Sequence, residues 1–270
     1  MSNKKRLDVA MTEQGLAESR QKAQAVIMAG QVYVDGQKVD KAGAPVGESA
    51  RIEVRGKTMP YVSRGGLKLE KAMACWPICL EGAVCADIGA STGGFTDCML
   101  QNGAAKVFAV DVGYNQLDWR LRTHPKVVCM ERTNARYLTV EQIPQPLDFF
   151  SVDVSFISLN LILPALRPLM APGGEGVCLV KPQFEAGKDK VGKKGVVRDP
   201  EVHLEVLSQF LIHAENADFT VKDITFSPIK GPEGNIEYLG HLRAGAGVPY
   251  GGDLWELVQR SHNVWKEGRE

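Results

Sequence analysis

Two charged residues stand at the ends of two apolar segments of this chain. Asp153 lies near the end of residues 147–154, and Lys181 lies near the end of residues 176–182. Both segments have the composition of buried strands, so either charge alone would be costly to bury. A lysine that faces an aspartate removes this cost and can also hold or move a proton. Singly, each residue is an ordinary charge at a strand end, but as a pair we interpret them as a proton-handling site.

A glycine-rich turn supplies a second kind of chemistry. The apolar residues 84–88 indicate a buried strand, and three glycines follow before a helix opens at Phe95, so a ligand can approach the backbone closely. A second predicted strand, 106–112, carries Asp111, and a carboxylate there can hold ribose hydroxyls. The pattern Asp-x-Gly-x-x-x-Gly-Gly-Phe from Asp87 resembles motif I of S-adenosylmethionine-dependent methyltransferases. A nucleotide-binding turn and a purely structural turn are the alternatives.

The order of the predicted elements explains how these residues meet. Strands are expected at residues 84–88, 106–112, 127–130, 147–154 and 176–182, and helical patterns separate them. Such alternation predicts a parallel sheet with helices on both faces. Ligands of such sheets bind outside the carboxyl ends of the strands. The charged pair and the glycine-rich turn are therefore expected at one edge.

Three more polar residues are expected at this edge. Lys68 lies close to the start of the helix predicted in residues 63–73, where a cation is not favoured by the helix dipole. Asn134 follows the third strand and is placed to meet an adenine or a ribose. Beyond a helix at 201–216 and a strand at 221–227, a closing hairpin strand at 235–242 brings Glu237 to the same edge.

The first part of the chain has a different character. Residues 1–68 carry twelve Lys and Arg against seven Asp and Glu, although the whole chain is neutral, and this balance favours contact with a polyanion. Helices are predicted from Arg6 and from Ser19, which is placed to cap the second one. A strand at 32–34, an Asp35-Gly36 turn and a return strand follow.

These residues resemble the alpha-L RNA-binding motif of a small-subunit ribosomal protein. The elements that carry the resemblance are Arg-Leu-Asp, Ser-Arg-x-x-Ala and Ala-Gly-x-Val-x-Val-Asp-Gly, which occur in this order between residues 6 and 36. The resemblance covers about residues 1–56 and implies contacts to RNA phosphates. The residues implied are Arg6, Ser19, Arg20, Lys22 and Lys41.

Length and composition agree with two domains. The 270 residues exceed a usual single domain, and 44% apolar residues suffice for a sizeable core. The chain contains no apolar run of membrane-spanning length and begins with polar residues, so neither a membrane span nor a secretory signal is predicted. Its six cysteines lack paired metal spacing and are expected to be reduced, in the cytoplasm. We expect domains at 1–58 and 63–245, a semi-rigid linker at 59–62, and a C-terminal tail at 246–270 that contains a helix.

Together the motifs resemble the TlyA, or hemolysin A-like, family of ribosomal RNA methyltransferases, whose catalytic domain is similar to FtsJ-type 2′-O-methyltransferases. The resemblance spans about residues 62–240 and rests on the motifs at 62–69, 87–97, 111–113, 153–159, 180–185 and 231–237. It implies an α/β fold: a Rossmann-like S-adenosylmethionine-dependent methyltransferase domain with a small N-terminal α+β RNA-binding domain. The chain departs from the family at the linker, where Met59-Pro60-Tyr61-Val62 replaces the Arg-x-Trp-Val segment of some members.

The resemblance also implies functional residues. A catalytic tetrad maps onto Lys68, Asp153, Lys181 and Glu237, and Arg64 joins the residues expected to contact RNA. S-adenosylmethionine is the implied cofactor, ribosomal RNA or a ribosomal subunit the implied partner, and no metal is required. The implied cofactor-binding residues are Asp87, Gly89, Ala90, Ser91, Thr92, Gly93, Gly94, Phe95, Asp111, Val112, Asn134, Ala135 and Phe156.

The chemistry of the tetrad can be derived separately. A ribose 2′-hydroxyl is a weak acid, so its attack on a sulfonium methyl needs a group that orients it and takes its proton. Partial desolvation and a second cation such as Lys68 favour the neutral amine of Lys181, which could accept that proton. Asp153 and Glu237 would hold the lysines in place. Two other functions stay open: a non-catalytic RNA-binding or ribosome-assembly factor, and a pore-forming hemolysin.

Overall fold

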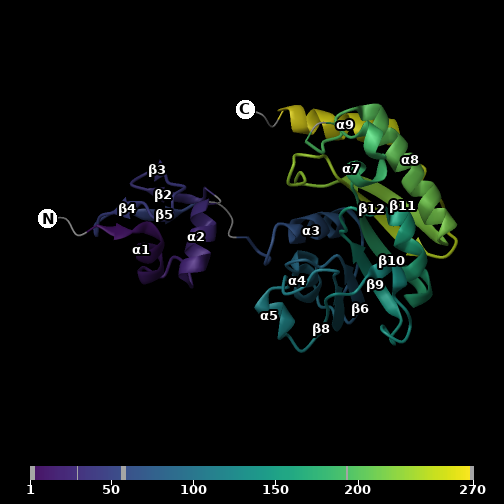
Figure 1. Cartoon of the computed structure of the whole chain (residues 1–270), viewed down its shortest axis with the longest axis horizontal. Helices are drawn as coiled ribbons and strands as arrows, with labels where there is room; N and C mark the ends of the chain where they lie inside the picture. The colour runs from purple at the N-terminus through teal and green to yellow at the C-terminus, as the bar shows by residue number, and fades with distance from the viewer. Residues whose placement is uncertain (1–3, 29, 56–58, 193, 268–270) are drawn as a thin grey trace. The chain divides into compact units, whose positions relative to one another are not determined.

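The computed structural model describes residues 4–28, 30–55, 59–192 and 194–267 of the chain. The chain divides into two compact units, residues 1–60 and 61–270 (Figure 1). The boundary falls inside the predicted linker 59–62. Tyr61 is buried in the second unit and donates its hydroxyl to Glu70 at 3.1 Å, while the backbone N–H of Val62 donates to Asp97 at 2.8 Å. The end of the linker is therefore built into the second unit.

In the part of the first unit that the structure describes, residues 4–28, 30–55 and 59–60, there are two helices and two small antiparallel sheets. The helices are α1 (Leu7–Glu13) and α2 (Arg20–Met28). One sheet pairs β1 (Lys5–Arg6) with β4 (Pro45–Val46), and the other has the order β3 (Gln37–Lys38), β2 (Val32–Val34), β5 (Ile52–Val54). Leu7, Met11, Ile27 and Val32 are fully buried and form the core between helices and strands.

The local predictions for this unit are confirmed. Asp35 and Gly36 both have positive φ values, 51° and 82°, which the favoured two-residue hairpin turn requires. The Ser19 hydroxyl accepts a bond from the backbone N–H of Lys22 at 3.3 Å, so Ser19 caps α2 as expected.

The second unit is built on a seven-stranded sheet in the order β11-β12-β10-β9-β6-β7-β8. Strands β10, β9, β6, β7 and β8 are parallel, whereas β12 runs antiparallel to both β10 and β11, as the predicted hairpin requires. The strands are β6 (Val84–Ile88), β7 (Lys106–Val110), β8 (Val127–Met130), β9 (Leu147–Val152), β10 (Met170–Val180), β11 (Phe219–Phe226) and β12 (Tyr238–Ala244).

One strand differs clearly from its predicted limits. β10 begins at Met170, six residues before the expected start at Gly176. Pro172, Gly173 and Gly174 read as a turn, but the strand passes through them with an irregular register between Met170 and Glu175. A bulge accommodates residues that a regular ladder excludes.

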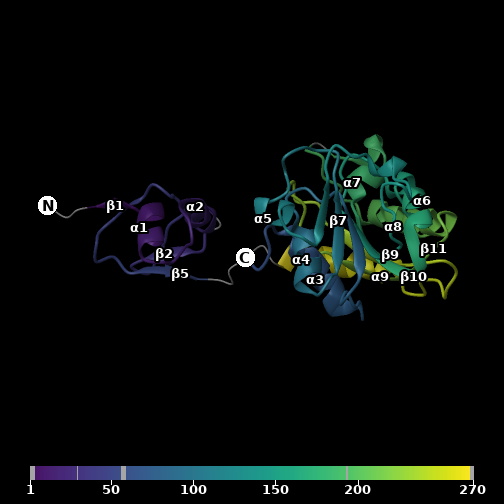
Figure 2. The same ribbon diagram turned by 90° about the horizontal axis from the view of Figure 1, so that it is seen from below.

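Helices cover both faces of the sheet (Figures 1 and 2). On one face α3 (Gly65–Cys75) and α4 (Gly94–Gln101) pack against alternate strand residues such as Cys85 and Val107. On the other face α6 (Leu163–Leu166), α8 (Pro200–Asn216) and α9 (Leu254–Glu267) cover the strand residues that point to that side, such as Ala86 and Phe108. The shorter helices are α5 (Trp119–Arg122), η1 (Ala135–Tyr137), η2 (Leu159–Leu161), η3 (Arg167–Leu169), α7 (Pro182–Glu185) and η4 (Lys188–Lys190).

The terminal helix α9 is part of this core. It forms over the segment where a helix was predicted, and its Leu257 and Val258 are buried among residues of the main cluster. The switch point of the sheet lies between β6 and β9, because the chain proceeds from β6 outward in one direction and from β9 in the other. A ligand is expected at the carboxyl ends of these two strands.

Candidate active site

A cavity of about 430 Å³ lies at the carboxyl ends of the parallel strands. All four predicted catalytic residues line it. The glycine-rich turn lines the same cavity with Asp87, Gly89, Ala90, Ser91, Thr92, Gly94 and Phe95. The residues predicted to do the chemistry and most of the predicted cofactor turn therefore share one space, of a size typical of small-molecule sites.

The four predicted catalytic side chains form a continuous array of ion pairs. The Lys181 Nζ lies 2.5 Å from Asp153 Oδ1, and the Lys68 Nζ lies 3.3 Å from Asp153 Oδ2. Lys68 also lies 2.8 Å from Glu237 Oε2. The two lysine side chains are only 9% and 10% exposed, so this array of two cations and two carboxylates is largely removed from water.

The strand register brings these residues together. Asp153 directly follows β9, and its backbone N–H donates to the carbonyl of Ile88 at the end of β6. Lys181 follows β10 and Glu237 precedes β12, and the last pair between these antiparallel strands joins Val180 to Tyr238. The ends of three neighbouring strands at one edge of the sheet and α3, which carries Lys68, thus converge on one point.

Charge balance fixes the ionisation of two members of the array. Burial lowers the pKa of Lys68, but attraction to Asp153 and Glu237 outweighs it and leaves that pKa above its ordinary value. Burial raises the pKa of Asp153, but Lys68 and Lys181 outweigh it and leave that pKa below its ordinary value. Lys68 is therefore a fixed ammonium and Asp153 a fixed carboxylate. Lys181 contacts one carboxylate, and its Nζ also donates to the Ser155 hydroxyl at 3.2 Å.

The glycines of the turn are required by its geometry. Gly89 has a φ of +83°, and a Cβ atom there would collide with the backbone carbonyl of Asp153. Gly93 caps α4 with a φ of +96°, and a Cβ there would collide with Leu117 and Leu121. Only glycine fits both positions without strain.

Asp87 stabilises the glycine-rich turn through the hydrogen bonds of its carboxylate. Its buried carboxylate accepts bonds from the backbone N–H of Thr96 at 2.8 Å, the hydroxyl of Thr96 at 2.7 Å and the hydroxyl of Ser151 at 3.1 Å. Burial raises the pKa of Asp87 to about 6. The carboxylate thus connects β6, β9 and α4. Sequence reasoning did not predict Thr96 and Ser151 as its partners, because these hydrogen bonds depend on the packing of α4 and β9 against β6.

Asp111 secures the other side of the turn. Its carboxylate accepts bonds from the backbone N–H groups of Ser91 and Gly113, each at 2.7 Å. Ser91 has a positive φ of 49°, so this contact supports a strained position. The predicted cofactor carboxylate is therefore tied directly to the cofactor turn.

Six residues predicted to bind the cofactor lie outside the cavity wall: Gly93 and Asp111, described above, and four more. Val112 and Phe156 are 71% and 90% exposed, and the Phe156 ring lies 4.9 Å from that of Phe184. The exposed Asn134 side chain caps η1 by accepting from Arg136, and the Ala135 side chain is buried in the core. Ala135 can meet a ligand only through its backbone.

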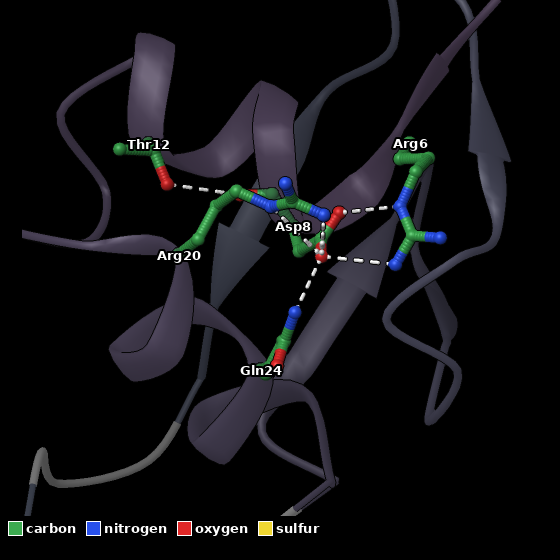
Figure 3. A network of polar contacts seen from close by, with 5 residues as sticks. All are labelled: Arg6, Asp8, Thr12, Arg20 and Gln24. Atoms are coloured by element: carbon green, nitrogen blue, oxygen red, sulfur yellow. Dashed lines mark hydrogen bonds and ion pairs between the residues drawn. The ribbon is translucent and has the colours of Figure 1, made fainter.

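The first unit contains a second polar centre, drawn in Figure 3. The Arg6 guanidinium donates two bonds of 3.0 Å to the Asp8 carboxylate, and Arg20 donates to it at 3.2 and 3.3 Å. Gln24 donates at 2.7 Å, and Thr12 donates to the Asp8 carbonyl at 2.9 Å. The hydrogen bond from Arg6 holds the pKa of Asp8 well below its usual range.

This centre brings two of the predicted phosphate ligands together. Asp8 is fully buried, whereas the Arg6 and Arg20 side chains are 53% and 54% exposed. Lys22 of α2 forms an ion pair with Glu18, which precedes this helix. The exposed Lys41 precedes Ala42, whose carbonyl accepts the backbone N–H of Asp8. Arg64 belongs to the second unit, where it precedes α3 and lines the cavity.

Sequence reasoning missed part of the cavity wall. The turn between β11 and β12 contributes Ile229, Lys230, Gly231 and Pro232. Gly231 and Pro232 fell within a motif that carries the family resemblance, but none of the four was predicted as a site residue. The Pro-x-Gly-Asn residues of this turn directly precede Glu237, and this proximity was the available signal. The wall of the cavity therefore includes a segment of the hairpin as well as the parallel strands.

Comparison with known proteins agrees with this geometry. The FtsJ-like methyltransferase family matches residues 61–244, and the S4 domain family matches residues 5–52. The chain therefore belongs to the FtsJ-like methyltransferases, with an S4 domain at its N-terminus, as predicted. S-adenosylmethionine is the cofactor of this class, and a cavity lined by the backbone of a glycine-rich turn fits it.

Within this class, the chain belongs with the TlyA proteins, as its individual relatives show. The chain is 43% identical to the 16S/23S rRNA (cytidine-2′-O)-methyltransferase TlyA of Mycobacterium tuberculosis over 90% of this chain and 91% of the relative. It is 44% identical to Hemolysin A of Brachyspira hyodysenteriae over 88% of this chain and 99% of that relative. A solved structure from Streptococcus thermophilus is 45% identical, covers 99% of both chains and has a TM-score of 0.79. None of the helices in the described residues is long and apolar enough to cross a membrane.

Proposed function

We propose that this protein methylates a ribose 2′-hydroxyl of ribosomal RNA within a ribosomal subunit in the cytoplasm. The observation that carries this proposal is the ion-paired array of Lys68, Asp153, Lys181 and Glu237 in the cavity of the cofactor turn. The relatives agree with it, since that of M. tuberculosis is named a 16S/23S rRNA (cytidine-2′-O)-methyltransferase and that of Campylobacter jejuni a 23S rRNA (cytidine-2′-O)-methyltransferase.

The bound cofactor supplies a methyl group activated by a sulfonium. The protein must orient the weakly acidic hydroxyl and remove its proton as the oxygen displaces the sulfur, which would leave as a neutral thioether, from the methyl carbon. Lys181 is the group we assign to this task, because it lines the cavity and contacts one carboxylate, whereas Lys68 contacts two. The proton passes from the ribose oxygen to the Lys181 amine. The resulting ammonium is stabilised by Asp153.

The other members of the array hold this geometry. Lys68 stays charged and shares Asp153 with Lys181, so one carboxylate holds both lysines. Glu237 fixes Lys68. Much of the rate enhancement then comes from positioning, which can contribute about 7–11 kcal/mol in well-aligned reactions.

The S4 unit supplies recognition in this proposal. Two half-exposed guanidinium groups oriented by one buried carboxylate suit the bidentate binding of phosphates. We assign Arg6, Arg20 and Lys41 to the RNA backbone, with Lys22 and the start of α2 at Ser19 beside them, and Arg64 to RNA at the cavity.

Methylation of isolated ribosomal subunits tests this function. We would incubate the purified protein and labelled S-adenosylmethionine with 30S and 50S subunits from cells that lack its gene, and then map ribose methylation. Incorporation at a 2′-oxygen that is unmodified in those cells is expected. Cofactor binding without transfer to either subunit would favour a non-catalytic assembly factor. Dye leakage from liposomes would favour the pore-forming alternative.

A further inference from the structure

Ser155 lies in the wall of the catalytic cavity, two residues after Asp153. Its hydroxyl accepts a hydrogen bond of 3.2 Å from the Nζ of Lys181, the group to which we assign the proton transfer. The same nitrogen lies 2.5 Å from Asp153 Oδ1. Ser155 is not a member of the tetrad, yet it contacts the same nitrogen as Asp153 does.

The segment that carries Ser155, between β9 and η2, is held at both ends. At one end the backbone N–H of Asp153 donates to the last residue of β6 at 2.9 Å. At the other end the Glu185 carboxylate accepts bonds from the hydroxyl of Ser158 at 2.6 Å and from the backbone N–H of Leu159 at 2.9 Å. Glu185 belongs to α7, which begins directly after the catalytic lysine. These bonds therefore tie the segment to the lysine that its hydroxyl contacts.

A strained residue follows Ser155 directly. Phe156 has a positive φ of 63°, a conformation that bulky side chains rarely adopt. Such strain persists only where the surrounding contacts over-determine the backbone, and it is concentrated at functional sites. The hydrogen bonds at the two ends of the segment supply this constraint. Although Ser155 is exposed, its backbone position is thus set by the fold.

The two contacts at the Lys181 nitrogen fix the direction of its amine. Besides its bond to carbon, this nitrogen has three tetrahedral positions. In the neutral amine two of them are N–H groups, which donate to Asp153 and Ser155, and the third is the lone pair. The carboxylate alone would hold one N–H and leave two positions open to the lone pair. The hydroxyl of Ser155 reduces these two positions to one.

We propose that Ser155 is a positioning residue that directs the lone pair of Lys181 toward the ribose 2′-hydroxyl. This inference rests on the proposed function and deepens it. The proton passes from the ribose oxygen to the Lys181 nitrogen, and the electron pair of the broken O–H bond stays on the oxygen that attacks the methyl carbon. Ser155 neither gains nor loses a proton. It contributes through alignment, so it should affect the rate of transfer and not the affinity for either substrate.

The test compares Ser155→Val with Ser155→Thr, because valine and threonine have nearly the same shape and differ in the hydroxyl. Methyl transfer would be followed in single turnovers with saturating unmodified ribosomal subunits and S-adenosylmethionine. Ser155→Val is expected to be about 10-fold slower than wild type, whereas Ser155→Thr should stay within about 3-fold. Equal rates of the valine and threonine variants would overturn the proposal, since the hydroxyl would then have no role.

Ser155→Ala and Ser208→Ala give the matched control. The Ser208 hydroxyl also makes a hydrogen bond, of 2.9 Å to the Leu204 carbonyl, but it lies on α8 outside the cavity wall. Ser208→Ala should transfer at the wild-type rate, and Ser155→Ala should be as slow as Ser155→Val. In Ser155→Ala the KM for the subunit and the calorimetric affinity for S-adenosylmethionine should both stay close to wild type. A raised KM with an unchanged rate would show a direct contact to RNA and overturn the proposal.

A double variant tests whether Ser155 acts through Lys181. In the Lys181→Ala background, Ser155→Ala should cause no further loss of rate, because no amine remains to be positioned. A further loss of about 10-fold in that background would show an independent role and contradict the proposal. A wild-type protein that transfers no methyl group would show failure of the proposed function before any variant is compared.

Discussion

Each unit of this protein contains a carboxylate shared by two basic side chains. In the catalytic unit Asp153 lies between Lys68 and Lys181, and in the S4 unit Asp8 lies between Arg6 and Arg20. Both carboxylates are buried or nearly so. The lysine side chains are 9% and 10% exposed, whereas the arginine side chains are 53% and 54% exposed.

The difference matches the task that we assign to each unit. A lysine that is largely buried can give up its proton when its surroundings favour the neutral amine, but an arginine stays charged. The array around Asp153 therefore suits proton transfer. The cluster around Asp8 suits the presentation of permanent charge to a polyanion. One arrangement of charges thus has two uses, which burial and residue type distinguish.

The largest effect is expected from Lys181→Ala. Loss of the proposed proton acceptor removes an interaction that matters in the transition state, so kcat should fall at least ~10²-fold. Affinity for S-adenosylmethionine should change little, because the glycine-rich turn is untouched. Calorimetry and steady-state rates on ribosomal subunits measure the two quantities. A kcat within about 3-fold of wild type would contradict the assignment.

Gly93→Val is expected to have the next largest effect. A branched side chain at a φ of +96° would meet Leu117 and Leu121 and displace the start of α4. We expect affinity for S-adenosylmethionine to fall at least ~10-fold. Gly82→Val is the matched control, because Gly82 also has a positive φ but faces open space outside the cavity wall. Equal cofactor affinities in the two variants would show that the turn does not bind the cofactor.

Asp8→Asn separates recognition from catalysis. It removes the charge that orients Arg6 and Arg20, so RNA affinity should fall about 5-fold while kcat at saturating RNA stays close to wild type. Hydrogen bonds to charged groups contribute about 1.5–3 kcal/mol each, so the free energy of unfolding of this unit should fall by about 2 kcal/mol. A fall in kcat that exceeds the fall in RNA affinity would contradict the division of tasks.

The pH dependence of this difference in the free energy of unfolding follows from the lowered pKa of Asp8. A carboxylate with a depressed folded-state pKa adds stability above its unfolded pKa of about 3.9, and this stability is lost as pH falls through the folded value. The stability difference between wild type and Asp8→Asn should thus stay constant from pH 8 to about pH 5. It should shrink at lower pH.

The last effect is expected from Asp87→Asn, and it touches stability alone, with a pH dependence opposite in sign to that of Asp8→Asn. The folded pKa of Asp87 is raised to about 6, so its contribution to stability is fully present below the unfolded pKa of about 3.9 and is lost as pH rises through 6. Wild type should gain about 1–3 kcal/mol relative to Asp87→Asn between pH 7 and pH 4. Denaturant titrations at several pH values measure this. A difference that does not change with pH would show that Asp87 ionises normally.

The sequence was informative where function depends on strand ends and backbone geometry. The proximity of Asp153, Lys181 and Glu237 could be predicted, because parallel strands end at one edge of the sheet and a hairpin returns to that edge. The glycine-rich turn could be recognised because only glycine tolerates its geometry. A helix within residues 246–270 was predicted from the local pattern of apolar residues alone, and it forms at Leu254–Glu267.

Contacts that depend on side-chain packing could not be predicted in this way. Nothing in the sequence showed that Asp8 joins Arg6 to Arg20, or that Lys230 meets Trp265. The extension of β10 through Pro172 was missed because a bulge overrides local preference. Phe156 is among the residues expected to bind the cofactor, and nothing in the sequence showed that its ring meets that of Phe184.

The most direct test of the contrast between the two centres is Lys181→Arg. Arginine keeps the positive charge beside Asp153 but does not become a neutral base. Methyl transfer to ribosomal subunits would be followed under single-turnover conditions across pH. We predict that the wild-type rate rises with pH, and that the arginine variant is at least ~10²-fold slower and lacks this rise. A flat wild-type profile together with an active arginine variant would show that Lys181 acts as a fixed cation, as we propose for the arginines around Asp8.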